Sequence, residues 1–218
     1  MRKIIAVMGV LLILTACQNK KIQPNDISNC WNFDLSGRAG GWVILEDDRL
    51  YFETAFDRCQ LLEQTSDRLV FRLEYDSVRV ANHVLQAALT ITSETSKLLN
   101  RADLVLRSSS VVEDESLIFL LGAGIYLHDS LGVYTDCDQC GMITCAVDEP
   151  GDTLSDTSFP HHRRYMAVLT PGRSIQRIVD NTLISVQPRS IGDTLTYFFG
   201  ASDNQESDEE WIREVAEF

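Results

Sequence analysis

The chain has 218 residues, of which 44% are hydrophobic, 23% are charged and 5 are prolines. This composition excludes a disordered, collagen-like or multi-span membrane protein, and the length allows one large domain or two small ones. The formal net charge of −13 disfavours sequence-independent nucleic-acid binding, because that binding depends on phosphate neutralisation by Lys and Arg.

The N-terminal segment predicts export from the cytoplasm. Arg2 and Lys3 precede an apolar run over residues 4–14, which has the length of a signal-peptide core and is too short to span a bilayer. The run ends in Leu-Thr-Ala-Cys at positions 14–17. Together these features resemble the signal peptide and lipobox of bacterial lipoproteins.

This resemblance implies a lipid anchor. Residues 1–16 would be removed, Cys17 would carry acyl chains, and residues 17–28 would form a lipidated tether that holds the protein to a membrane of the cell envelope. In Gram-negative lipoproteins, aspartate after the lipidated cysteine is the signal for retention in the inner membrane. Because Gln18 stands at that position, the resemblance implies the outer membrane if the organism is Gram-negative. The alternative is an ordinary secretory signal, with Cys17 left as a plain thiol.

Residues 29–202 are predicted to form an all-β antiparallel sandwich, because apolar residues alternate with period two in short runs separated by turn residues. Gly122 and Gly124 predict a bent or bulged strand where they interrupt one run. The expected strands are 42–45 and 50–56, joined as a hairpin by Asp47 and Asp48, and then 69–75, 85–91, a short run from 104, 117–121 with 125–127, 142–147, 165–169, 174–179, 183–186 and 195–199.

The turn Leu169-Thr170-Pro171-Gly172 lies between two of these strands. With it, residues 78–200 loosely resemble the immunoglobulin-like sandwiches of bacterial envelope proteins, a likeness that concerns fold alone. Residues 29–75 are expected either to form a separate meander beside a sandwich of residues 76–202, or to belong to the same sandwich.

Residues 203–218 are predicted to form a short acidic amphipathic α-helix. Ser207 and Glu210 make a capping box, and Trp211, Val215 and Phe218 share one face at helical spacing. This apolar face is a candidate partner-binding surface, and docking on the chain's own sheet is the alternative.

Charge is distributed unevenly along the chain. Residues 108–162 contain ten acids and no Lys or Arg, and the basic cluster 161–164 follows them directly. The acidic stretch is interpreted as a solvated face, a cation site or a surface for a basic partner. The basic cluster is expected to pair with the chain's own acidic loop or with an anionic partner.

Five cysteines remain if Cys17 is lipidated: Cys30, Cys59, Cys137, Cys140 and Cys145. A disulfide between Cys30 and Cys59 is expected because these residues flank the predicted 42–56 hairpin. A second disulfide is expected within the group of Cys137, Cys140 and Cys145. Such bonds suit the oxidising compartment that an export signal implies.

The same cysteine group has two other interpretations. Zinc could be bound by Cys137, Cys140 and Cys145 with His161 or His162 as the fourth ligand. The C-x-x-C spacing of the first two could also serve redox catalysis, although β-like residues follow it instead of the helix that lowers a thiol pKa.

Calcium is the other metal considered. Asp136 and Asp138, followed by Gly141, resemble the start of a calcium loop, but Cys140 and Val147 occupy positions where an EF-hand needs oxygen ligands. No cofactor is predicted, but zinc stays open at the cysteine group and calcium at an irregular oxygen-ligand site of Asp148, Asp152 and Asp156. Asp136 and Asp138 are kept as candidate metal ligands.

The sequence therefore predicts a lipid-anchored envelope protein with a non-catalytic binding or assembly role. Its partner would be an envelope protein or polymer, recognised by the acidic loops around residues 129–162 and by the C-terminal helix. The alternative is a metal- or thiol-dependent envelope enzyme centred on Cys137, Cys140 and Cys145.

Overall fold

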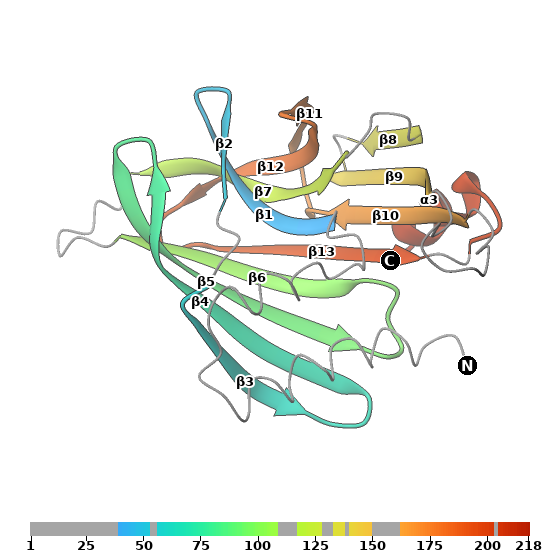
Figure 1. The fold of residues 1–218 in the computed structure, drawn as a ribbon, viewed down its shortest axis with the longest axis horizontal. Coiled ribbons are helices and arrows are strands. Elements are labelled where there is room, and N and C mark those ends of the chain that lie inside the picture. Colours follow the sequence, from blue (N-terminus) through green and yellow to red (C-terminus); the bar gives the residue numbers. More distant parts are fainter. Residues whose placement is uncertain are drawn as a thin grey trace, which may run out of the picture.

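The computed structural model describes residues 39–52, 56–108, 117–127, 133–137, 140–149, 162–202 and 205–218. These residues form two antiparallel sheets and one short C-terminal helix (Figure 1), which confirms the predicted all-β sandwich. The predicted signal peptide 1–16, the predicted tether 17–28, Cys17 and Cys30 lie outside the described residues.

The larger sheet has eight strands in the order β3-β4-β5-β6-β13-β10-β9-β8. All of its neighbouring strands pair antiparallel. In that order the strands are β3 (Arg58–Gln64), β4 (Arg68–Val80), β5 (His83–Glu94), β6 (Asn100–Ser108), β13 (Thr194–Ser202), β10 (His162–Leu169), β9 (Met142–Glu149) and β8 (Val133–Cys137).

The smaller sheet has five strands in the order β11-β12-β7-β1-β2 and covers one face of the larger sheet. Its strands are β11 (Ile175–Val179), β12 (Thr182–Ser190), β7 (Ile118–Tyr126), β1 (Ala39–Glu46) and β2 (Arg49–Tyr51). The described residues thus hold thirteen strands, against about seven to nine in an immunoglobulin domain. The likeness to that family is one of architecture.

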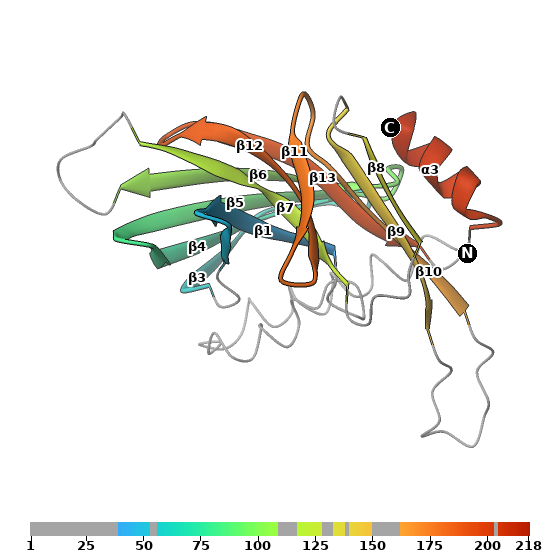
Figure 2. The ribbon, with the colours of Figure 1, turned by 90° about the horizontal axis from the view of Figure 1, so that it is seen from above.

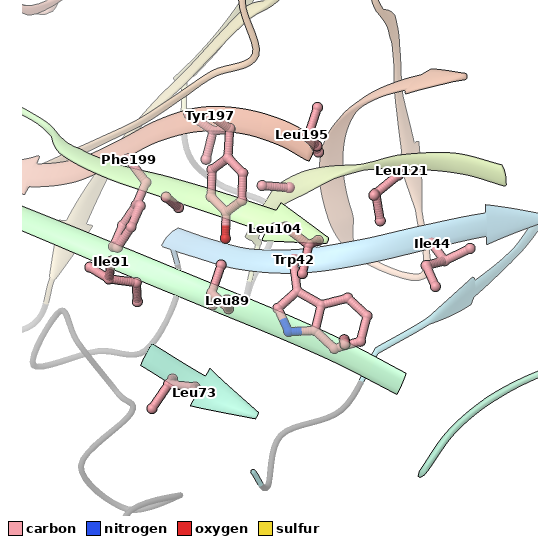
Figure 3. Close-up of a cluster of buried hydrophobic side chains, with 14 of the residues drawn as sticks. Trp42, Ile44, Leu73, Leu89, Ile91, Leu104, Leu121, Leu195, Tyr197 and Phe199 are labelled. Carbon is pink, nitrogen blue, oxygen red and sulfur yellow. The ribbon is translucent and has the colours of Figure 1, made fainter. Parts of the chain in front are cut away.

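The main hydrophobic core lies between the two sheets (Figure 3). Trp42 and Ile44 of β1 point into it from the smaller sheet, and Leu89, Leu104 and Tyr197 point into it from the larger one. Each of these side chains is at most 2% exposed. Alternation in the strand sequences produces this core, because every second side chain of a strand faces the same side of a sheet.

A close contact between the sheets forms at Gly40. The buried Tyr197 hydroxyl donates a hydrogen bond of 3.0 Å to the Gly40 carbonyl, across the core from β13 to β1. The pairing of β1 with β7 shifts register at this position, and Gly40 has a φ of +90°. A Cβ atom there would lie 2.2 Å from the Phe199 ring, so the approach requires glycine.

The structure differs from the predicted strands in three places. β3 and β8, at the two edges of the larger sheet, were not predicted from sequence. β2 ends at Tyr51, whereas the sequence predicted a strand over residues 50–56. β4 passes through positions 75–76 with a register shift between Tyr75 and Val78, and residues on both sides of the shift face the same core.

β7 runs continuously through Gly122 and Gly124, in agreement with the prediction of one strand across these glycines. A Cβ atom on Gly122 of β7 would lie 1.9 Å from the Ser185 carbonyl of β12, so only glycine allows the two backbones to approach this closely. The Arg177 guanidinium on β11 lies 2.7 Å from Asp48, in the turn before β2, and joins opposite ends of the strand order. Figure 1 shows β2 and β11 rising together on the side away from β13. A second hydrophobic cluster forms among residues of the smaller sheet. It contains the buried residues Val43, Leu45, Ile184 and Val186, with Leu50, Leu120 and Val179 partly buried against them.

The helix α3 (Asp208–Ala216) covers the outer face of the larger sheet at β9 and β10 (Figure 2). The Ser207 side chain caps it by accepting a hydrogen bond of 3.1 Å from the Glu210 amide. The Glu210 carboxylate in turn accepts one of 2.9 Å from the Glu206 amide. The predicted capping box therefore forms, with its return bond shifted by one residue.

Candidate functional site

The C-x-x-C sequence forms the turn between β8 and β9. Cys137 ends β8, Cys140 lies in the turn, and the two sulfur atoms form a disulfide. The Cys137 carbonyl accepts hydrogen bonds from the amides of Cys140 at 3.2 Å and of Gly141 at 2.9 Å. This confirms the prediction of one disulfide within the group of Cys137, Cys140 and Cys145.

Gly141 joins this turn to the body of the protein. It is buried with a φ of +70°, and a Cβ atom there would lie 1.8 Å from the Thr170 carbonyl. Its own carbonyl accepts hydrogen bonds from the Thr170 amide at 2.9 Å and from the Thr170 hydroxyl at 3.0 Å. The Ser185 hydroxyl lies 3.1 Å from the same carbonyl.

Polar side chains from both sheets meet beneath the turn, and we call Thr170, Ser174, Gln176, Ser185 and Gln187 the polar cluster. The hydroxyls of Thr170 and Ser185 form a hydrogen bond with each other, and Ser185 also bonds Ser174 at 2.9 Å. The Gln187 amide donates to the carbonyls of Thr170 at 3.0 Å and of Pro171 at 2.9 Å.

Gln176 of β11 connects the polar cluster directly to the disulfide turn. Its side-chain amide donates hydrogen bonds to the carbonyls of Cys137 at 2.9 Å and of Met142 at 3.1 Å. At this end of the sandwich several hydrogen bonds therefore join the two sheets. Because buried polar groups destabilise a fold unless they are paired, this network holds the turn in one position.

The remaining cysteines lie apart from the disulfide turn. Cys145 is 1% exposed and faces the main core, whereas Cys137 packs on the opposite side of the sheet, with the residues beneath α3. Cys59 is half-buried on the edge strand β3 and packs against the main core. Its predicted partner Cys30 is outside the described part of the chain.

Of the predicted metal ligands that the structure describes, Cys145 lies apart from the other two cysteines. Cys145 faces away from Cys137 and Cys140, Asp136 is exposed, and Asp138 and His161 are outside the described residues. Only the backbone of His162 is described, at the start of β10 opposite Glu149. Within the described ranges, no three His, Cys, Asp or Glu side chains gather as a metal-ligand group.

The acidic tail pairs with the basic cluster through Arg163 and Asp208. The Arg163 guanidinium donates two hydrogen bonds of 2.8 Å to the Asp208 carboxylate, so β10 holds the first turn of α3. These hydrogen bonds lower the pKa of Asp208 below its usual value. Arg163 of the basic cluster thus pairs with the acidic tail, whereas the sequence predicted a pairing with the acidic loop.

The predicted apolar face of the helix is mostly occupied by the chain's own sheet. Trp211 is 1% exposed and donates a hydrogen bond of 3.1 Å from its indole nitrogen to the Met166 carbonyl, and Val215 is fully buried. Phe218 remains 39% exposed, with its ring 5.2 Å from that of Phe198. Of the three candidate partner-binding residues, Phe218 alone presents substantial surface to a partner in this conformation.

Sequence reasoning missed the polar cluster. Ser185 and Gln187 follow the core residue Leu183 at spacings of two, so they occupy inward positions of β12. Polar residues at positions where period two predicts apolar ones were the available signal.

No protein-family model and no curated protein matches the chain, so these comparisons identify no family for it. No helix among the described residues is long and apolar enough to cross a membrane.

Proposed function

We propose that this protein is a lipid-anchored component of the bacterial cell envelope that binds a partner and carries out no catalysis of its own. The observation that carries the proposal is the N-terminal sequence, in which a basic start and a short apolar core end in Leu-Thr-Ala-Cys. The disulfide between Cys137 and Cys140 supports it, because such bonds persist in oxidising compartments outside the cytoplasm.

We assign the binding role to the end of the sandwich that carries α3, β8, β9 and β10. The helix packs on β9 and β10 (Figure 2), the strands that flank part of the predicted acidic region, and this contact supports the assignment. The exposed acid Glu209 lies on α3, and the exposed residues Glu217 and Phe218 follow the end of the helix. This combination suits a basic partner with an apolar contact point.

A lipid-labelling experiment tests the anchor. Cells that express the full chain are grown with an alkyne-tagged fatty acid, and the mature protein is analysed by intact mass and by membrane fractionation. Label on Cys17, a new N-terminus at that residue and membrane retention are expected, with Cys17→Ser as the unlabelled control. A secreted, unlabelled protein cleaved elsewhere would refute the anchor and leave the binding role to be tested separately.

Site-specific photocrosslinking tests the binding end. A photoreactive residue is placed at Glu209 or Phe218 in the full chain, and at Gln86 on the outer face of β5 as the exposed control. A discrete crosslinked band is expected from the two helix positions and not from the control. No band from either helix position, or the same band from all three, would refute the assignment.

The alternative of a metal- or thiol-dependent enzyme centred on three cysteines gains no support from the geometry. Cys145 lies on the opposite face of the sheet from Cys137, so the three sulfur atoms do not share one centre.

A further inference from the structure

The disulfide is not what holds the β8–β9 turn in place. The turn is fixed by hydrogen bonds to the carbonyls of Cys137, Gly141 and Met142, and backbone amides or side chains of the polar cluster donate all of them. The bond closes a ring over a sequence separation of only 3. Because a cross-link restricts the unfolded chain less when its loop is shorter, this one adds little to stability compared with a long-range bond.

The two cysteines differ in their accessibility. Cys140 is exposed in the turn, whereas Cys137 is half-buried and packs against the apolar cluster beneath α3. Thiol–disulfide exchange requires an incoming thiolate to reach one of the two sulfurs. The exposed Cys140 sulfur is therefore the expected point of attack, and the Cys137 sulfur is the leaving group.

The turn also accommodates the reduced state. The Cys140 sulfur lies 3.4 Å from the Cys137 carbonyl oxygen, within reach of a hydrogen bond that a thiol can donate. After reduction this bond is available without movement of the backbone, and the other hydrogen bonds of the turn do not involve sulfur. The oxidised and reduced forms are thus both compatible with the same fold.

From these observations we propose that the Cys137–Cys140 pair is a reversible thiol-exchange site. A thiolate RS⁻ attacks the Cys140 sulfur and forms R–S–S–Cys140, while the electron pair of the broken bond leaves on the Cys137 sulfur as a thiolate. A second RS⁻ attacks the R sulfur and releases RSSR and the Cys140 thiolate. Two thiols are oxidised to one disulfide, and the protein gains two electrons and, from solvent or from RSH, two protons.

The charge near the site selects among thiols. Asp136 is exposed directly before Cys137, so an anionic reagent is repelled more than a cationic one. The site therefore favours thiols that carry positive charge or belong to a basic protein surface. We expect cysteamine to react about threefold faster than 2-mercaptoethanesulfonate at equal thiolate concentration, and Asp136→Asn to reduce this preference.

Graded reduction of the folded mature protein tests the proposal. The chain with Cys17→Ser is incubated in buffers of increasing dithiothreitol, quenched with an alkylating reagent and mapped by peptide mass, while circular dichroism follows the fold. Alkylation of Cys137 and Cys140 with unchanged circular dichroism is expected, and reoxidation should restore the bond. Resistance to reduction until the protein unfolds would overturn the proposal, because the bond would then be a structural cross-link.

Variants that lack one cysteine of the pair test the direction of attack. In Cys137→Ser the remaining Cys140 thiol should react with cystamine about tenfold faster than the Cys137 thiol does in Cys140→Ser, with modification read at each residue by peptide mass. Equal rates, or a faster Cys137, would contradict the assigned roles.

In the same Cys137→Ser variant the Cys140 thiolate attacks a disulfide RSSR, which is the reverse of the second step above, and keeps R as a mixed disulfide while RS⁻ leaves. The variant therefore distinguishes two sources of R in cells. A mass increase of a small thiol on Cys140 identifies a low-molecular-weight reagent, and a protein-sized, reducible adduct on Cys140 identifies a protein thiol. Either adduct supports the site. None of these tests depends on lipidation or on the proposed binding partner, so their failure would leave that proposal unchanged.

Discussion

Replacing Gly122 with alanine tests how the smaller sheet is built. The added Cβ atom would lie 1.9 Å from the Ser185 carbonyl oxygen and 2.7 Å from the Val186 Cα, and both neighbours are backbone atoms. To reach ordinary contact at 3.4 Å, β12 must move away from β7 by about 1.5 Å. Side-chain rotation cannot relieve this clash, so the strand itself has to shift.

The expected loss of stability follows from what that shift breaks. Ser185 is hydrogen-bonded to the Gly141 carbonyl and to Ser174, and breaking these two bonds removes about 2 kcal/mol in all. Strained packing around β12 adds about 1–3 kcal/mol. We therefore expect Gly122→Ala to lower the free energy of unfolding by about 3–5 kcal/mol.

Urea unfolding, followed by tryptophan fluorescence and circular dichroism, measures this loss. Gly41→Ala is the matched control, because Gly41 lies on the neighbouring strand β1 with no atom within 4 Å of its added Cβ and with no positive φ. The control should change stability by less than about 1 kcal/mol. A Gly122→Ala protein as stable as the control would refute the close approach of β7 and β12.

Three further predictions concern α3 and the main core. Trp211→Ala should reduce the free energy of unfolding by about 3–5 kcal/mol in urea titration, because it leaves a buried cavity and removes a hydrogen bond. A loss below about 1 kcal/mol would mean that α3 does not pack on the larger sheet. Asp208→Asn should cost about 1 kcal/mol at pH 7, because it removes the charge that Arg163 binds bidentately. Since the pKa of Asp208 is lowered from 3.8, the wild-type advantage should disappear as the pH falls well below 3.8, and a difference that persists there would contradict the pairing. Tyr197→Phe should lower the free energy of unfolding by about 1–3 kcal/mol, because it leaves the buried Gly40 carbonyl without the hydroxyl that it binds. Burial also raises the pKa of Tyr197, so its phenol should ionise in the wild-type protein only well above pH 10, which ultraviolet titration can measure.

The strands that the sequence predicted best are those with one buried face and a regular alternation. β4 and β5 carry apolar residues at every second position over 69–75 and 85–91, and the structure buries these residues in the main core. β3 escaped prediction because it lies at a sheet edge and contains a bulge. Its extra residue Leu62 is 48% exposed beside Leu61, which interrupts the period of two.

The helix and the disulfide could be predicted for a different reason, namely that each depends on residues close together in sequence. The cap at Ser207 needs only Glu210, three positions away, and Cys137 reaches Cys140 within one turn. Cys145 was grouped with that pair by its spacing alone. Its position on the inward side of β9 removes it from the turn, because alternate residues of a strand point to opposite faces.

The sequence by itself determined the fold class, the capped C-terminal helix and the local turn chemistry, since these depend on periodicity and on neighbours within a few residues. Only the tertiary structure decided which surfaces are already occupied. Trp211 contacts β10 across 45 positions and Tyr197 contacts β1 across 157, and Ser185 reaches Gly141 across 44. Such contacts depend on the order of strands in the sheets, which local patterns do not encode. The helix face that was a candidate partner surface is therefore largely interior, and the inconspicuous serines and glutamines of β11 and β12 hold the disulfide turn in place.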